Sequence, residues 1–193
     1  GAGPINWAGI NGASETGIST FLLQPRVDAG DILIQKRVPV GENETAGELY
    51  ERLKVDGADV VVETVDRFAE GSLSPKSQDD REATPAPKLT KETARVDWSK
   101  SAAEIRNLIR GTNPFPGAFT EWKNGILKLH SASLTDCTGT AGQVLSADPK
   151  SGLVVATGEG ALRLDTVQPQ GKKAMDGAAL VLGYNVDVGD QLS

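Results

Sequence analysis

The sequence is poor in several residue types, and each shortage argues against a class of protein. Aromatic residues make up only 5% of the 193 residues, which disfavours a membrane barrel or a platform of stacked side chains that reads RNA bases. The single cysteine, Cys137, cannot form a disulfide within the chain, so we expect a cytoplasmic setting. Apolar runs such as residues 60–62 are interrupted by charges far below transmembrane length, so we expect no membrane association.

Signals for targeting and for common ligands are also missing. Residues 1–6 lack the basic and apolar regions of a secretion signal. No Walker A motif or Gly-x-Gly-x-x-Gly motif opens a helix after a strand, so nucleotide binding by those routes has no support. Cys137 and the single histidine, His130, have no metal-ligand spacing, and no nucleophile or carboxylate near His130 in the sequence could use it. We expect no metal site and structural roles for both residues.

Charge is distributed unevenly along the chain, whose net charge is −6. Residues 1–87 carry eight basic and fifteen acidic side chains, and residues 129–193 carry four and seven. Residues 88–128 carry eight basic and four acidic side chains and are therefore net positive. A basic stretch in an acidic chain can form a confined face that contacts phosphate, or it can be ordinary solvated surface.

The hydrophobic pattern of residues 1–72 predicts an α/β unit. A short helical turn is expected at residues 4–10, and buried strands at residues 17–23 and 32–40. The residues Asp28-Ala29-Gly30-Asp31 between the strands have the composition of a turn.

A long helix follows the second strand. Residues 45–48 have the spacing of a capping box, and Gly71 is a natural end. The residues expected to form its buried apolar stripe are Leu49, Leu53, Val61, Val65 and Phe68.

Beyond this helix the pattern predicts a linker and then a small closed barrel. Residues 73–94 are rich in proline and polar residues and show no period. A second capping box, residues 101–104, opens a short helix, and a last helical stretch is expected at residues 176–182. The expected strands are residues 119–122, 126–129, 143–146, 153–157 and 161–167, the first two joined through Asn124-Gly125.

Two places could carry chemistry. Asp28 lies at the mouth of a strand and is followed by small residues that allow a substrate to approach, although the same residues are also typical of a plain turn. Lys172 and Lys173 follow a turn and would suit phosphate contact, with a solvated loop as the alternative.

Several segments together resemble the methionyl-tRNA formyltransferase family. They occur in the family's order and span nearly the whole chain, and the set is specific although no single segment is diagnostic. The matching segments are residues 1–5, 15–20, 28–33, 88–92, 94–98, 113–118 and 168–175.

The resemblance implies the second half of a Rossmann-like formyltransferase domain (residues 1–72), a linker (residues 73–94) and an OB-like barrel that holds tRNA (residues 95–193). It implies formyl transfer from 10-formyltetrahydrofolate to the α-amine of methionyl initiator tRNA, with no metal, by an enzyme that is a monomer when complete. The alternative interpretations are a sugar-amine formyltransferase of the same superfamily and a non-catalytic tRNA-binding module.

The resemblance also assigns roles to individual residues. Asp28 matches the family's catalytic aspartate, which orients a histidine and helps to relay a proton. The residues assigned to the folate site are Gln24, Pro25, Arg26, Val27 and Gly30, in a loop that lacks the acidic residue common in the family. The residues assigned to tRNA contact are Lys88, Lys91, Arg95, Arg106, Arg110, Lys172 and Lys173.

The family's catalytic asparagine and histidine lie upstream of the segment matched by residues 1–5. His130 cannot replace that histidine, because the resemblance places it in the barrel. The start at Gly1 and the lone interior Met175 favour a truncated chain. We therefore expect the chain to be inactive on its own.

Overall fold

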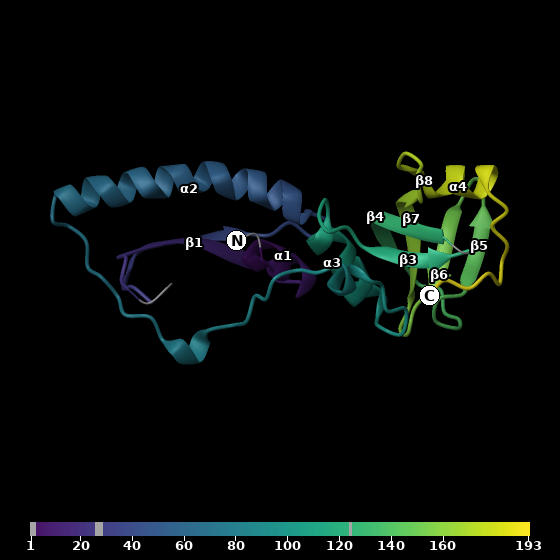
Figure 1. Cartoon of the computed structure of the whole chain (residues 1–193), viewed down its shortest axis with the longest axis horizontal. Coiled ribbons are helices and arrows are strands. Elements are labelled where there is room, and N and C mark those ends of the chain that lie inside the picture. Colours follow the sequence, from purple (N-terminus) through teal and green to yellow (C-terminus); the bar gives the residue numbers. More distant parts are fainter. Residues whose placement is uncertain (1–2, 26–28, 124) are drawn as a thin grey trace.

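The computed structural model of the chain describes residues 3–25, 29–123 and 125–193. Two halves lie along the long axis (Figure 1): an amino-terminal half with the long helix α2 (Ala46–Ala69), and a carboxy-terminal half built mainly of strands. Helix α3 (Ala102–Thr112) lies between them. The α/β fold expected from the sequence is confirmed. No helix among the described residues is long and apolar enough to cross a membrane.

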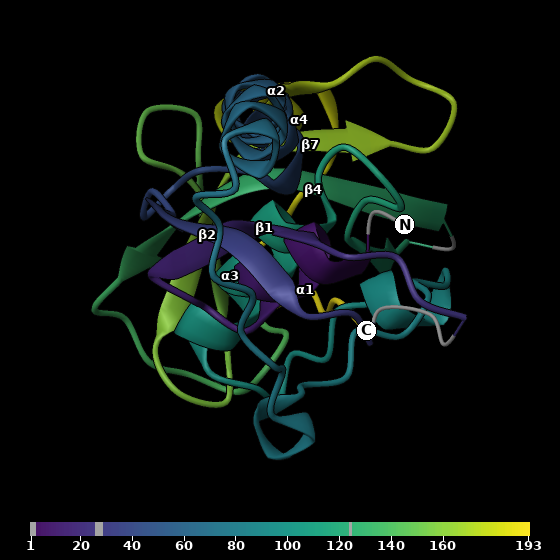
Figure 2. The same ribbon diagram turned by 90° about the vertical axis from the view of Figure 1, so that its left-hand side faces the viewer.

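The amino-terminal half is a strand pair covered by helices. After α1 (Gly3–Ile10), strand β1 (Glu15–Phe21) pairs antiparallel with β2 (Ile32–Pro39), and α2 lies along one side of the pair (Figure 2). Its core is formed by Val38, Val40, Leu49 and Leu53, with Ile5 and Ile18 packed against it.

The predicted capping box at the start of α2 is confirmed, but the predicted apolar stripe is only half right. Leu49 and Leu53 are buried, whereas Val61, Val65 and Phe68 are 53%, 62% and 64% exposed. In the second half of the helix the buried residues are Val60 and Thr64 instead, and the hydroxyls of Thr64 and Thr20 lie 2.8 Å apart. In the described structure this part of α2 faces the two-stranded β1–β2 sheet through Val60 and Thr64, so the predicted stripe lies on the outward side of the helix.

The predicted linker, residues 73–94, runs back along the amino-terminal half (Figure 1). Apart from the short 3₁₀ turns η1 (Asp80–Glu82) and η2 (Glu92–Ala94), it is irregular in the described structure. It touches that half at both ends: Lys76 pairs with Ile32, and the indole of Trp7 donates a 2.8 Å hydrogen bond to the carbonyl of Pro87. The domain boundaries at this segment stay predictions.

The carboxy-terminal half is an antiparallel sheet with the order β3-β4-β7-β6-β5 in the described residues, and β8 pairs with β7. The five predicted strands are present, but β4 extends six residues beyond its predicted end and β8 was not predicted. The bounds are β3 (Phe119–Trp122), β4 (Gly125–Thr135), β5 (Val144–Asp148), β6 (Gly152–Ala156), β7 (Ala161–Pro169) and β8 (Met175–Asp176), followed by α4 (Gly177–Gly183).

The last residues close this sheet into a barrel. Ser193 exchanges two backbone hydrogen bonds with Glu121 of β3, at 2.6 and 3.1 Å. On the other side, Val144 of β5 donates to the carbonyl of Asp190 and accepts from the amide of Gly189. The two sheet edges are therefore joined through residues 189–193, which agrees with the closed barrel expected from the sequence.

Helix α3 is shared by both halves. Its capping box, formed by Ser101 and Glu104, is present as predicted, and Ile105 and Ile109 are buried in the barrel core. At its carboxyl end it packs against α1 so closely that a Cβ on Gly9 would lie 2.8 Å from the Cα of Gly111.

Candidate functional site

The loop that carries the predicted catalytic residue is closed at its base by β1 and β2. The amide of Leu22 donates a 3.1 Å hydrogen bond to the carbonyl of Asp31, and Gly30 is buried against Leu22. A Cβ on Gly30 would lie only 1.6 Å from the Leu22 carbonyl oxygen, so only glycine fits there. Gln24 and Pro25 are exposed.

The other predicted residues of this loop, Arg26, Val27 and Asp28, lie outside the described residues. Their predicted roles therefore stay predictions. The structure describes the neighbouring ends of β1 and β2 and the buried Gly30.

Two arginines predicted to contact nucleic acid are engaged at the junction of the halves. Arg110 is only 7% exposed; its Nη1 donates to the carbonyls of Gly41 and Glu44 at 3.0 and 3.4 Å. Its Nε donates to Asn107 Oδ1 at 2.9 Å. Burial lowers the pKa of Arg110, and the neighbouring positive charge of Arg106 adds to this. Arg110 therefore holds the residue 41–44 loop on α3.

Arg106 lies one turn before Arg110 and forms an ion pair with Glu42 at 3.2 Å. Its side chain is 17% exposed, whereas that of Glu42 is 77% exposed. The guanidinium of Arg106 is thus directed toward the loop of the amino-terminal half, as is that of Arg110. The structure therefore brings these two residues together at the junction with the residue 41–44 loop.

Lys172 and Lys173 lie exposed on the loop between β7 and β8. The loop is fixed from beneath, because Gln168 Nε2 donates to the carbonyl of Lys172 at 2.7 Å and Gln168 Oε1 lies 3.0 Å from His130 Nε2. The side chain of Gln170 accepts from the amide of Ile126 at 3.2 Å. Both ammonium groups are therefore presented to solvent by a well-anchored turn.

The remaining predicted basic residues lie where the linker reaches the barrel. Lys88 and Lys91 are exposed, and the Lys91 ammonium sits 5.4 Å from the centre of the Phe119 ring. Arg95 is half-buried and forms an ion pair with Glu121 at 3.0 Å. These residues belong to the same stretch of the sequence, but the two lysines are exposed whereas the charge of Arg95 is paired with that of Glu121.

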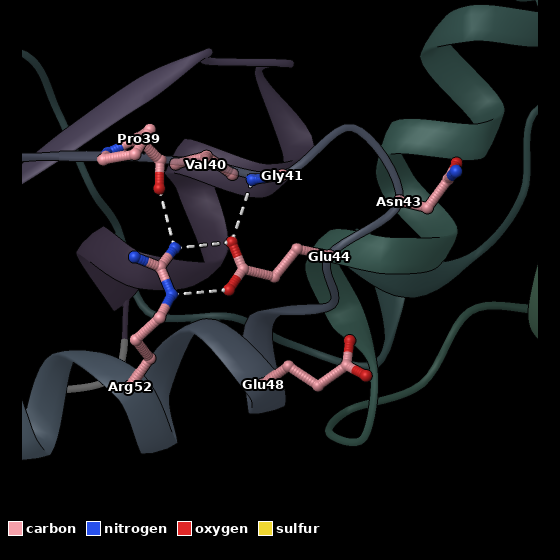
Figure 3. Close-up of a pocket in the computed structure, with 7 residues that line it drawn as sticks. All are labelled: Pro39, Val40, Gly41, Asn43, Glu44, Glu48 and Arg52. Carbon is pink, nitrogen blue, oxygen red and sulfur yellow. Dashed lines mark hydrogen bonds and ion pairs between the residues drawn. The ribbon is translucent and has the colours of Figure 1, made fainter.

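A shallow pocket lies between β2 and the start of α2, and Figure 3 shows the side chains that line it. Arg52 binds both carboxylate oxygens of Glu44, at 3.0 and 2.8 Å, and donates to the carbonyl of Pro39 (Figure 3). The hydrogen bond from Arg52 holds the pKa of Glu44 below its usual range. Because Glu44 is paired with Arg52 and the other carboxylate of the pocket, that of Glu48, accepts hydrogen bonds from Thr45, we assign the pocket a structural role.

In the part of the chain that the structure describes, no three His, Cys, Asp or Glu side chains are grouped so as to hold a metal ion. Cys137 is exposed on the barrel. His130 lies in β4, where its ring contacts Gln168. The structural role expected for His130 thus has a definite partner.

Sequence reasoning missed two polar residues that hold the structure around the site. Asn6 is buried, and its Nδ2 donates to the carbonyl of Gly111 at 2.7 Å. Gln78, in the predicted linker, donates from Nε2 to the carbonyl of Gly30 at 2.7 Å. Glycines inside two helices, Gly9 and Gly111, are a signal that could have indicated close packing of α1 on α3.

Two family models match the chain in order. The model described as "Formyl transferase" matches residues 1–65, and "Formyl transferase, C-terminal domain" matches residues 88–185. Among curated proteins, a methionyl-tRNA formyltransferase of Caldanaerobacter subterraneus is 41% identical over 98% of this chain, and one of Geobacter metallireducens is 37% identical over 100%. The chain spans 61% of the length of each of these relatives.

Solved structures share the fold at low sequence identity. HypX from Aquifex aeolicus superposes with a TM-score of 0.70 at 20% identity, covering 98% of this chain and 34% of HypX. An N-formyltransferase from Helicobacter canadensis, in complex with folinic acid and dTDP-3-aminofucose, superposes with a TM-score of 0.62 at 16% identity. This match covers 86% of this chain and 60% of that protein.

Proposed function

Because the chain belongs to the formyl transferase family, we propose that it is part of a methionyl-tRNA formyltransferase, which transfers a formyl group from 10-formyltetrahydrofolate to the α-amine of methionyl initiator tRNA. The observation that carries the proposal is the pair of family matches, at residues 1–65 and 88–185, together with curated relatives of that name over 98–100% of the chain. We place the enzyme in the cytoplasm as a monomer.

The amino-terminal half would contribute one side of the reaction site. A neutral amine attacks the formyl carbon, and the tetrahedral oxyanion that forms needs hydrogen-bond donors. The intermediate collapses by breaking the bond between the formyl carbon and N10, so that tetrahydrofolate leaves with a proton on N10 and the amine loses one. We assign to Asp28 the orientation and charge stabilisation of a histidine supplied by a preceding segment, and a share in relaying the proton that the amine loses. The loop residues Gln24, Pro25, Arg26 and Val27 would contact the folate, with Gly30 allowing close packing at the base.

The barrel would contribute a surface for tRNA phosphates. Lys172 and Lys173 are the strongest candidates, because both are exposed and their loop is anchored by Gln168. Lys88 and Lys91 would extend this surface along the linker, and Arg95 would join it only by exchanging its ion pair with Glu121. Arg106 and Arg110 are left out of the proposed contacts, since both guanidinium groups are bound to the amino-terminal half. Phosphate contacts of this kind weaken as salt rises.

The test separates the two halves by kinetics. In the complete enzyme, with methionyl initiator tRNA and 10-formyltetrahydrofolate, Asp28→Asn should lower kcat by about 10²- to 10⁴-fold, with a small effect on the KM for tRNA. The double variant Lys172→Ala/Lys173→Ala should raise the KM for tRNA and leave kcat within about twofold. Lys150→Ala, which removes an exposed charge from the β5–β6 turn, is the matched control and should change neither constant.

Three results would contradict the proposal. Near-normal kcat in Asp28→Asn would remove that residue from the reaction, and formylation by the 193-residue chain alone would refute its dependence on a preceding segment. Formylation of an amino sugar nucleotide, with methionyl-tRNA left unmodified, would assign the chain to the sugar enzymes.

A further inference from the structure

The segment Lys76–Gln78, which we call the return segment, lies beside the start of β2. Lys76 and Ile32 exchange two backbone hydrogen bonds, each of 2.8 Å, in an antiparallel bridge. The return segment thus lies against the residues that lead into β2, even though the sequence places it in an irregular linker. Figure 1 shows the chain reversing at the end of α2 and running back along the amino-terminal half toward α3.

Side chains of the return segment bind the residues just before β2. Ser77 Oγ donates to Asp31 Oδ1 at 3.0 Å, and Gln78 Nε2 donates to the carbonyl of Gly30 at 2.7 Å. The Gln78 bond is partly buried, although Gln78 itself is exposed. The consecutive residues 30–32 are therefore each held by one residue of the return segment.

The same residues are also held by Leu22, which directly follows β1. Leu22 donates its amide to the carbonyl of Asp31, and Gly30 lies so close to the Leu22 carbonyl that it has no room for a side chain. Residues 30–32 are consequently held by two separate segments of the chain, the one that contains Leu22 and the return segment. Removing one set of contacts should shift these residues without unfolding the core, because Ser77 and Gln78 are exposed.

We propose that Gln78 is a positioning residue for formyl transfer, an inference that rests on the proposed function of Asp28. Gly30 follows Asp28 by two residues, so the distance between their Cα atoms is at most about 7 Å even in an extended chain. The amide of Gln78 binds the Gly30 carbonyl, in the peptide group that joins Gly30 to Asp31, and so restrains the chain two residues after Asp28. Catalytic geometry tolerates little displacement, since a misplacement of about 1 Å can lower the rate about 100-fold.

The test replaces the donor without changing its shape. Gln78→Glu keeps the side-chain length but has no N–H to offer the Gly30 carbonyl. The matched control is Gln35→Glu on β2, which makes the same charge change at an exposed glutamine whose Nε2 donates to Ser19 Oγ at 3.3 Å. In the complete enzyme, Gln78→Glu should lower kcat about 10- to 100-fold and leave the KM for tRNA within about twofold, whereas Gln35→Glu should change neither.

A second measurement uses the 193-residue chain itself. Gln78→Glu should speed amide hydrogen exchange at Leu22 and Ile32 and trypsin cleavage after Arg26, with exchange in the barrel unchanged. Ser77→Ala, which removes the donor to Asp31, should act in the same direction more weakly.

The outcomes distinguish a failure of this inference from a failure of the proposed function on which it rests. If Asp28→Asn abolishes turnover and Gln78→Glu does not lower it, the positioning role is wrong and the proposed function stands. If Gln78→Glu lowers kcat only in proportion to a general loss of thermal stability, the role is structural and the inference also fails. If neither Asp28→Asn nor Gln78→Glu affects turnover, the proposed role of Asp28 is wrong, and the positioning role of Gln78 is wrong with it.

Discussion

Replacing Arg110 by methionine should weaken the junction between the two halves. Methionine keeps the apolar stem of the side chain but removes the guanidinium, which donates to the carbonyls of Gly41 and Glu44 and to Asn107 Oδ1. Because Arg110 is only 7% exposed, water cannot easily take over these bonds. The change therefore tests whether this arginine holds the residue 41–44 loop or serves a surface function.

The magnitude follows from the geometry of those bonds. A hydrogen bond that involves a charged group contributes about 1.5–3 kcal/mol, and the 3.0 Å bond to Gly41 is the main one lost, since that to Glu44 is longer at 3.4 Å. Burial already opposes the charge of Arg110 in the folded chain, as the lowering of its pKa indicates, and this offsets part of the gain. We expect Arg110→Met to lower the free energy of unfolding by about 2 kcal/mol.

The assay is urea unfolding of the 193-residue chain, followed by circular dichroism and by tryptophan fluorescence. Arg106→Met is the matched control on the same helix, because its ion-pair partner Glu42 is 77% exposed and such pairs contribute at most about 1 kcal/mol. A larger loss for Arg106→Met than for Arg110→Met would refute the reasoning. So would a loss below about 0.5 kcal/mol for Arg110→Met, the size expected of ordinary surface substitutions.

Two further predictions concern α2. Thr45→Ala should lower the free energy of unfolding by about 1 kcal/mol at pH 7 through loss of the capping box. Hydrogen bonds from the Thr45 backbone and hydroxyl lower the pKa of Glu48 in the folded state, so the part of the contribution that depends on the Glu48 carboxylate is present above the unfolded pKa of about 4.3 and is lost as the pH falls further. The bond from the Glu48 amide to the Thr45 hydroxyl does not titrate, and pH-dependent urea unfolding separates the two parts. Leu49→Ala should cost about 2–5 kcal/mol, and the exposed Val65→Ala less than about 0.5, in the same unfolding assay.

Local features were predictable from the sequence because their causes are local. Both capping boxes, at Thr45 and at Ser101, form as predicted, since each needs only a hydroxyl and a carboxylate three residues apart. The barrel strands follow from short alternating segments separated by turns. The face of α2 that packs could not be fixed in this way, because Val60 and Val61 differ only in which neighbours the fold places beside them.

The contacts that hold the site were beyond sequence reasoning for a related reason. Gln78 lies in a polar, proline-rich stretch whose composition indicates a linker, and its bond to Gly30 spans 48 residues. Arg110 lies in a basic stretch of the kind that can bind phosphate. The structure shows that its guanidinium instead donates to carbonyls of the residue 41–44 loop, which is distant in the sequence. Composition indicates how exposed a segment is on average but does not identify the distant partner of one side chain.

The sharing of α3 between two cores limits how far the chain can be treated as a set of modules. Ile105 and Ile109 complete the barrel, while Gly111 of the same helix receives α1 and the amide of Asn6. Exchange of the carboxy-terminal half between related enzymes would therefore have to carry a compatible α1 surface, or the recipient would present a bulky side chain where two glycines now meet. Together with the linker contacts to Ile32 and Trp7, this helix constrains where the chain could be cut and rejoined.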